Sequence, residues 1–139
     1  MKIIVIHSNK EFKKEVTVFL EKVLFHKVIA FVSDDSEFLK LKNIVEADVI
    51  LIDVSTSAID AFVLVKRVLI NYHYLKFVAL TDDLEKICLL DLLQSGFKGC
   101  ILKRDFKENI TSVLNAICLG KSLFPREIKI KAQDNKSCV

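Results

Sequence analysis

Short apolar runs alternate with longer amphipathic segments along the chain. The runs are dense in valine, isoleucine and leucine, a pattern typical of strands buried on both faces of a parallel sheet. We expect strands at residues 3–6, 28–32, 49–53, 77–80 and 100–102. Between them, apolar residues recur at three- and four-residue spacing, which indicates helices packed along one side. These segments lie at about 12–23, 33–45, 58–71, 84–95 and 107–119.

Strands that alternate with helices at this spacing favour right-handed crossovers and a parallel sheet covered on both faces. Five such units predict an α/β fold of the flavodoxin-like (βα)5 type, with strand order 2-1-3-4-5. In that order the first and third strands are neighbours, so Asp53 would lie beside the loop that begins at His7. Gly96 and Gly120 follow the last two helix segments, where glycine commonly ends a helix.

Length and composition set the broad class. The 139 residues are 52% hydrophobic and 28% charged, as expected for one globular domain with its own core. We expect this domain at residues 1–124, with residues 125–139 forming a C-terminal tail or a truncated linker. The net charge of +3 comes from scattered lysines, so direct nucleic-acid binding by this chain is not expected.

The expected cellular location follows from the lack of a membrane-spanning or signal-peptide pattern in the sequence. No apolar stretch approaches the length of a membrane span or a signal peptide. The cysteines form no C-x-x-C pair and no His-Cys ligand spacing, which favours a reducing cytoplasm over a disulfide or metal framework. We therefore expect a cytoplasmic protein without membrane contact.

Three polar residues follow strands at the predicted carboxyl edge of the sheet: Asp53, Thr81 and Lys103. Each alone is an ordinary turn or surface residue. Together they match phosphoryl transfer to a carboxylate, in which Asp53 would be the nucleophile. Lys103 would bind the phosphoryl oxygens and the Thr81 hydroxyl would donate a hydrogen bond to one of them.

These residues stand in motifs that resemble the receiver domains of two-component response regulators (CheY-like). The resemblance covers about residues 2–124 and rests on Val49-Ile50-Leu51-Ile52-Asp53, Val78-Ala79-Leu80-Thr81 and the segment from Gly96 to Lys103. It implies that Asp53 is the phosphoacceptor of a phosphorelay, Thr81 the switch hydroxyl and Lys103 the phosphate-binding lysine. The segment 114–125 is similar to the exit of receivers that precede a LuxR-type helix-turn-helix. A receiver of this kind is a signal-transduction module and not an enzyme.

The chain departs from the family where metal binds. The family's acidic pair, which holds Mg2+, is replaced by His7 and Ser8. Mg2+ requires oxygen ligands, usually carboxylates, so we expect Mg2+ binding to be weak and no metal or other cofactor to be required. Cys100 replaces the aromatic residue that couples the switch in the family. These departures predict an atypical receiver, acting through protein contacts with weak or no phosphorylation.

An interface is predicted from the fourth helix segment. Its stretch Lys86-Ile87-Cys88-Leu89-Leu90-Asp91-Leu92-Leu93 has apolar residues on nearly every side of a helix. We therefore expect some of Cys88, Leu89 and Leu92 to be exposed beside Cys100, unless another chain covers them, and to bind a protein partner or a second copy as a homodimer. A fully packed helix is the alternative.

Two other functions remain open. A working phosphoacceptor would regulate a DNA-binding output domain that is not present in this chain, with a sensor kinase or phosphotransfer protein as its donor. A flavodoxin-like enzyme or cofactor binder would need a glycine-rich phosphate loop, but the three glycines all lie from Gly96 onward. Flavin or nucleotide absorbance in the purified protein would favour that last function.

Overall fold

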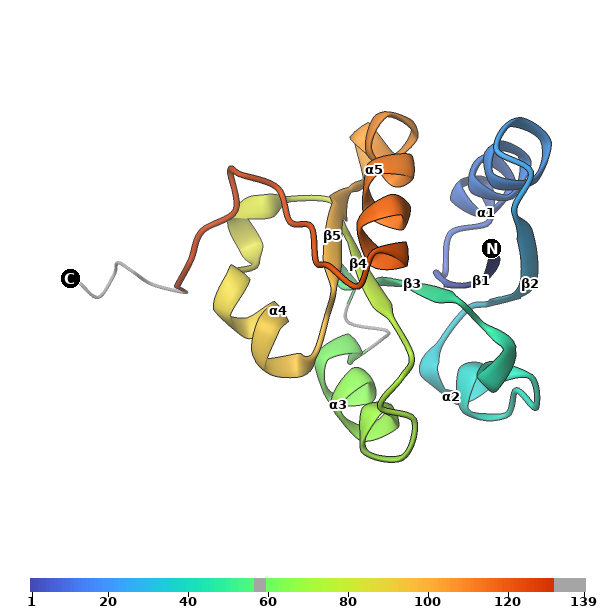
Figure 1. The fold of residues 1–139 in the computed structure, drawn as a ribbon, viewed down its shortest axis with the longest axis horizontal. Helices are drawn as coiled ribbons and strands as arrows, with labels where there is room; N and C mark the ends of the chain where they lie inside the picture. Colours follow the sequence, from blue (N-terminus) through green and yellow to red (C-terminus); the bar gives the residue numbers. More distant parts are fainter. Residues whose placement is uncertain (57–59, 132–139) are drawn as a thin grey trace.

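A five-stranded parallel sheet forms the centre of the molecule. The computed structural model describes residues 1–56 and 60–131 of the chain. The strands are β1 (Lys2–Ile6), β2 (Lys27–Val32), β3 (Val49–Asp53), β4 (Phe77–Thr81) and β5 (Gly99–Leu102). Their order is β2-β1-β3-β4-β5, and all neighbours pair in parallel. The flavodoxin-like fold and its strand order are therefore confirmed (Figure 1).

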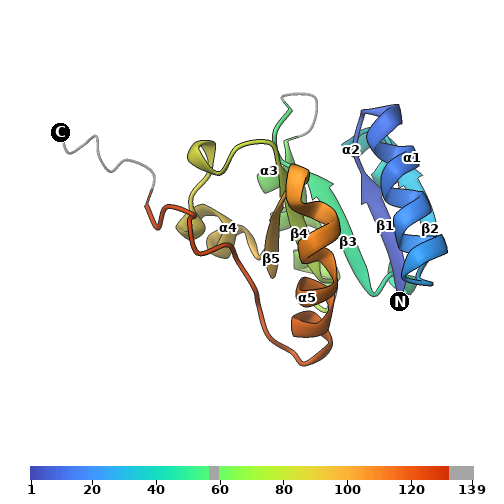
Figure 2. The same ribbon diagram turned by 90° about the horizontal axis from the view of Figure 1, so that it is seen from above.

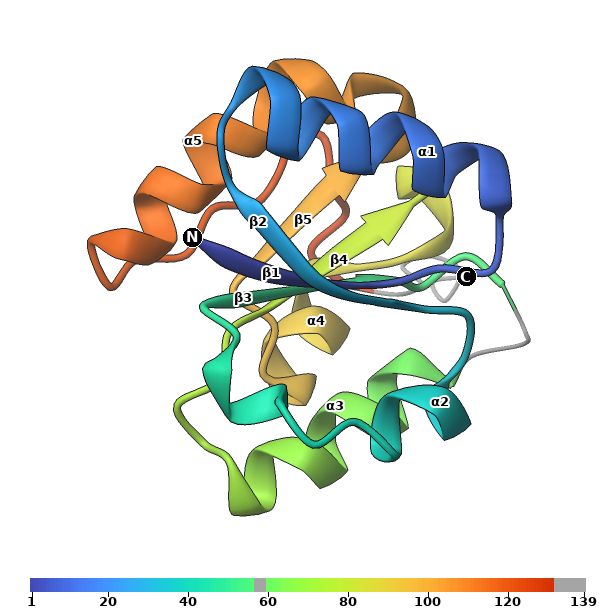
Figure 3. The same cartoon turned by 90° about the vertical axis from the view of Figure 1, so that its right-hand side faces the viewer.

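Helices cover the two faces of this sheet. They are α1 (Lys10–Val18), α2 (Asp35–Leu39), α3 (Ala61–Asn71), α4 (Leu89–Ser95) and α5 (Phe106–Cys118). Figures 2 and 3 show α1 and α5 on one face, and α2, α3 and α4 on the other. Successive strand residues feed opposite cores because side chains alternate across a strand. Thus Ile3 and Val5 pack beneath α1 and α5, whereas Ile4 and Ile6 pack towards α2 and α3.

Several predicted helices differ in their limits. The segment 12–23 is α1 followed by a π-helical turn at Phe19–Val23. The segment 33–45 is the short α2 and a 3-10 turn at Ile44–Glu46. The predicted start at Ala58 and the nearby Ser57 lie outside the described residues, and α3 begins at Ala61 after its N-cap Asp60. No helix in residues 1–56 and 60–131 is long and apolar enough to cross a bilayer.

The prediction of a single helix at residues 84–95 is wrong. A 3-10 turn at Leu84–Lys86 precedes Ile87 and Cys88, which are both extended, and α4 starts only at Leu89. The reason is non-local: Cys88 pairs as an isolated parallel bridge with Lys129, far along the chain. That pairing draws the backbone out of the helical conformation.

The expected exposure is also wrong for Cys88 and Leu92. Cys88, Leu92 and Cys100 are buried, and Leu89 is half-buried. The apolar side chains of this helix that do reach solvent are Leu90 and Leu93. Leu92 and Cys100 belong to the core cluster that also contains Ile128, which lies beyond α5 in the sequence.

Residues 121–131 of the same chain, which we call the C-terminal segment, cover these buried residues of α4 and β5. They return from the end of α5 past β5 to α4 (Figure 1). Leu123 pairs with Gly99 at the edge of the sheet, and Lys129 pairs with Cys88. The predicted boundary at residue 124 therefore falls within a segment that packs on the domain, and residues 132–139 lie outside the described part.

Candidate functional site

Four strands of the sheet end at one edge, and each brings a polar residue there. β1 leads into His7, β3 ends at Asp53, β4 ends at Thr81, and β5 is followed at once by Lys103. The parallel registers align these ends, with Ile6 opposite Ile52 and Thr81 opposite Leu102. The predicted meeting of an acid, a hydroxyl and an ammonium at this edge is therefore observed.

Asp53 and Lys103 form the centre of the site. The carboxylate of Asp53 is fully buried, and its Oδ1 lies 2.8 Å from the Lys103 Nζ, whose side chain is only 10% exposed. Oδ1 also accepts a hydrogen bond of 2.9 Å from the Ser55 backbone N–H. A buried carboxylate is costly unless it is paired and hydrogen-bonded, and these two donors supply both conditions.

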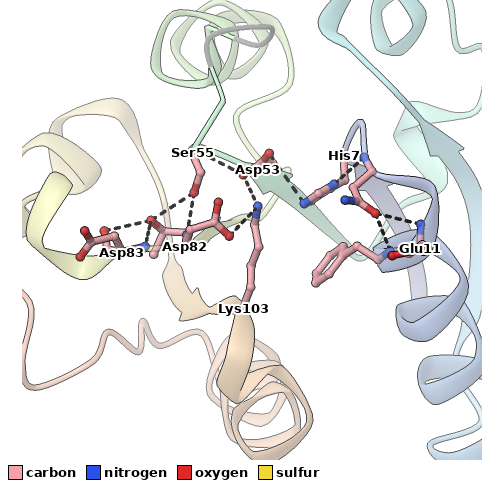
Figure 4. Close-up of polar contacts among 10 residues, drawn as sticks. His7, Glu11, Asp53, Ser55, Asp82, Asp83 and Lys103 are labelled. Atoms are coloured by element: carbon pink, nitrogen blue, oxygen red, sulfur yellow. Dashed lines mark hydrogen bonds and ion pairs between the residues drawn. The ribbon is translucent and has the colours of Figure 1, made fainter.

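His7 faces the other carboxylate oxygen. Its Nδ1 accepts a 3.0 Å hydrogen bond from the Asn9 backbone N–H, which assigns the ring proton to Nε2 in the neutral tautomer. Nε2 lies 3.7 Å from Asp53 Oδ2, and both atoms are buried without a hydrogen-bond partner among the described residues. Burial and the nearby Lys103 charge lower the pKa of His7, whereas Asp53 and Asp82 oppose that shift. His7 is thus a neutral donor directed at a free carboxylate oxygen (Figure 4).

Thr81 is held away from direct contact with the acid. Its hydroxyl donates to the Asp83 carbonyl and accepts from the Asp83 N–H, both at 3.2 Å. Ser55 links the two residues, because its Oγ lies 3.4 Å from Thr81 Oγ1 and its own N–H bonds to Asp53. Ser55 Oγ also accepts a 2.6 Å bond from the Asp82 N–H. The hydroxyl predicted from the sequence therefore reaches Asp53 only through Ser55.

Ser55 and Asp82 are residues of this site that the sequence reasoning missed. Asp82 Oδ1 lies 3.3 Å from Lys103 Nζ, so the ammonium lies between two carboxylates (Figure 4). The side chain of Asp82 is 68% exposed, in contrast to buried Asp53. The signal for Ser55 was its position two residues after a strand-end aspartate, where such residues close a turn. The only signal for Asp82 in the sequence was its position directly after Thr81.

The oxygen donors around Asp53 do not fit Mg2+. The end of β1 supplies His7, Ser8 and Asn9 and no carboxylate. The Asn9 oxygen already accepts from the Glu11 and Phe12 N–H groups as the N-cap of α1. Lys103 takes the place between the remaining acids, and residues 1–56 and 60–131 contain no cluster of three metal-binding side chains. Since His7 Nε2 bears its proton, it is not a free ligand for a softer metal.

A cleft of about 550 Å³ opens beside this site, between α1 and the start of α5. Phe12, Val16 and Phe106 form its apolar part. The ring of Phe12 stacks on His7 with centroids 4.3 Å apart, and Lys103 Nζ lies 5.7 Å from the same ring. Phe12 therefore shields the polar residues from the side of α1.

The strand order, the two helix layers and the edge of the sheet that holds Asp53 define the receiver fold. The chain matches a crystal structure of the non-phosphorylated receiver domain of the stress response regulator RcsB from Escherichia coli. The TM-score is 0.76 at 20% identity, over 91% of this chain and 98% of that one. No protein-family model and no curated protein matches the sequence.

Two further solved structures are similar. One is the isolated receiver domain of RcsB from Salmonella enterica serovar Typhimurium with the phosphomimetic BeF3-, at TM-score 0.73 and 20% identity, over 91% of this chain and 94% of that one. The other is RcsB of the same organism bound to a promoter in the presence of BeF3-, at TM-score 0.75 and 20% identity, over 92% of this chain. This chain covers only 64% of that longer protein. At such identity the likeness establishes the fold.

Proposed function

We propose that the chain is an atypical receiver module of a two-component signalling system, with weak or absent phosphorylation of Asp53 and with protein contacts carrying the signal. It is a regulatory module and not an enzyme, and it works in the cytoplasm, where Cys88, Cys100 and Cys118 stay reduced. One observation carries this proposal: the acid at the receiver position is paired with Lys103, and no carboxylate stands at the end of β1.

Two physical reasons support weak phosphorylation. The first is electrostatic, because transfer to a carboxylate brings two anions together and a bound cation normally offsets their repulsion. The second is access to the nucleophile. Oδ1 of Asp53 is engaged by Lys103, and Oδ2 is buried next to His7. An incoming phosphoryl group would have to displace these neighbours before Asp53 could attack.

The test is phosphorylation by acetyl phosphate with and without Mg2+, followed by intact mass. In this reaction a carboxylate oxygen of Asp53 bonds to phosphorus and acetate leaves. We expect little or no gain of a phosphoryl group. A gain-of-function variant, His7→Asp with Ser8→Asp, restores two carboxylates and should become phosphorylated when Mg2+ is present. Efficient Mg2+-dependent modification of the wild type, lost in Asp53→Asn, would contradict the proposal.

The second candidate is a working phosphoacceptor switch that controls a DNA-binding output domain outside this chain. The placement of Thr81 and Lys103 around Asp53 favours it. The likeness to a promoter-bound RcsB, of which this chain covers 64%, is compatible with it. The mass experiment separates the two candidates, because only this one requires stoichiometric modification of Asp53.

The contact surface that we favour is the exposed side of α4. Leu90 and Leu93 are 41% and 49% exposed, while their neighbour Leu92 is fully buried. We expect Leu90→Lys with Leu93→Lys to weaken binding of a partner or self-association measured by sedimentation. Ile70→Lys, at another exposed apolar position on α3, is the matched control. Equal association of all variants would exclude this surface.

A further inference from the structure

The C-terminal segment lies in its groove as a bound peptide would. Leu123 N–H donates to the Lys98 carbonyl at 3.0 Å, and Leu123 pairs in parallel with Gly99 at the free edge of β5. Towards the other end, the Lys129 carbonyl accepts from the Leu89 N–H at 2.7 Å. The Ile130 carbonyl accepts from the next N–H of α4 at 3.0 Å. Main-chain pairing to a sheet edge is a common way to bind extended peptides.

Two side chains provide apolar contact between these two paired ends: Ile128, and Phe124, which is partly buried against the same core cluster. Ile128 is 7% exposed and belongs to the core cluster that includes Ile87, Leu92 and Cys100, while Cys88 is buried where it pairs with Lys129. Ile130, two residues further on, is 68% exposed. The groove therefore distinguishes positions within the segment, because it buries residue 128 and leaves residue 130 in solvent.

The link between α5 and the segment is bonded to the end of α5, where the Gly120 N–H donates to the Ile117 carbonyl at 3.0 Å and the Lys121 N–H donates to the Ala116 carbonyl at 2.8 Å. Residues 119–122 are all exposed. Gly120 has a φ of +74°, and a Cβ placed there would meet nothing within 4 Å. A left-handed glycine in open space allows the chain to change direction at low cost. The segment can therefore leave its own groove without disrupting the end of α5.

We propose that the groove along β5 and α4 is a binding site for an extended segment, and that a second copy of this chain supplies it by exchanging residues 121–131. The segment itself is the ligand whose fit the contacts above establish. The same segment on another copy can make the same contacts, which is the basis of segment exchange between identical chains. This inference rests on the proposal that protein contacts carry the signal.

Chain connectivity decides which copy fills the groove. A short link gives the segment an effective concentration on the order of millimolar at its own groove, so the wild type remains closed at lower protein concentrations. Deleting Lys121 and Ser122 shortens the reach of the link by about 7 Å. The segment can then no longer pair with Gly99 in its own chain, but it can pair in another.

The experiment compares the wild type with the chain lacking Lys121 and Ser122. Sedimentation of both chains with Leu90→Lys and Leu93→Lys, which removes association through α4, should show a monomer without the deletion and a dimer with it. Iodoacetamide labelling with peptide mass spectrometry reports the groove, because burial raises the pKa of Cys88 and raises that of Cys100 to about 12. Both should label as slowly in the dimer as in the wild type, with exposed Cys118 as the internal reference.

Two substitutions in the deletion chain provide matched controls. Ile128→Asp should return it to a monomer and speed labelling of Cys88 at least about ten-fold, as expected when the opening free energy falls by about 1.4 kcal/mol. Ile130→Asp introduces the same charge at an exposed position and should leave the dimer intact. A deletion chain that is monomeric, or dimeric with fast labelling of Cys88, would overturn the proposal.

A peptide experiment keeps the inference testable if the deletion does not fold. A synthetic peptide of residues 121–131, added to the full chain carrying Ile128→Asp, should restore slow labelling of Cys88 and Cys100. The same peptide with Ile128→Asp should not. Failure of the first peptide to protect either cysteine would refute segment binding. Efficient phosphorylation of Asp53 would instead overturn only the proposed function, since none of these measurements uses a phosphodonor.

Discussion

Replacing Lys103 by methionine tests the electrostatic account of the site most directly. Methionine keeps an unbranched apolar side chain but removes the ammonium 2.8 Å from Asp53 Oδ1. Fully buried Asp53 then retains one hydrogen bond, from the Ser55 N–H, and the nearby Nε2–H of His7. Removing one partner of a buried ion pair costs about 3–5 kcal/mol. The other carboxylate, Asp82, is mostly exposed, so its lost pair contributes only about 0–1 kcal/mol.

Urea unfolding followed by circular dichroism measures this loss. Because urea m values are about 1–3 kcal/mol per molar, the unfolding midpoint of Lys103→Met should fall by at least about 1 M. Asp53→Asn should cost less, because Lys103 can turn towards Asp82 and solvent. The double variant should recover most of the stability that Lys103→Met loses, since it leaves no unpaired buried charge.

Both the size of the stability loss in Lys103→Met and its rank relative to the double variant test the description of this ion pair. A loss below about 1 kcal/mol for Lys103→Met would mean that water already solvates Asp53 in the native protein. A double variant that is no more stable than Lys103→Met would show that the methionine itself disturbs the packing. Either result would refute the description of Asp53 and Lys103 as a buried, mutually dependent pair.

Three further predictions concern positions around the site and at helix ends. Folding lowers the pKa of His7 below its ordinary value of 6.5, so the unfolded chain takes up the proton first as the pH drops. The free energy of unfolding should therefore fall between about pH 8 and pH 5. The variant His7→Gln should flatten that dependence in urea titrations. Gly96→Ala places a Cβ 2.4 Å from Leu69 Cδ1 at a φ of +104° and should lower the free energy of unfolding by about 1–3 kcal/mol. Gly120→Ala, where the added Cβ meets open space, should lower it less, and thermal denaturation compares the two. Asn9→Ala removes the N-cap of α1 and should cost about 1 kcal/mol, which Asn9→Ser should largely restore; equal stability of the two variants would argue against capping.

The sheet and its functional edge were accessible from the sequence because their signals are local. Continuous apolar runs indicate buried parallel strands, and β3 was predicted with the limits that it has, Val49–Asp53. Strand order then followed from the class of alternating strands and helices, which placed Asp53, Thr81 and Lys103 at one edge. Turn and cap residues also acted locally, as Gly96 shows by ending α4 in the left-handed conformation.

Only the tertiary structure decided which partners these residues have. Ser55 and Asp82 enter the site because the loops after β3 and β4 meet, and no spacing in the sequence records that contact. The break before α4 has the same origin, because Cys88 pairs with Lys129 some forty residues later. Sequence periodicity showed that the apolar residues around Cys88 and Leu92 needed a cover. It did not show that Ile128 of the same chain provides it, since packing between distant segments depends on their meeting in space.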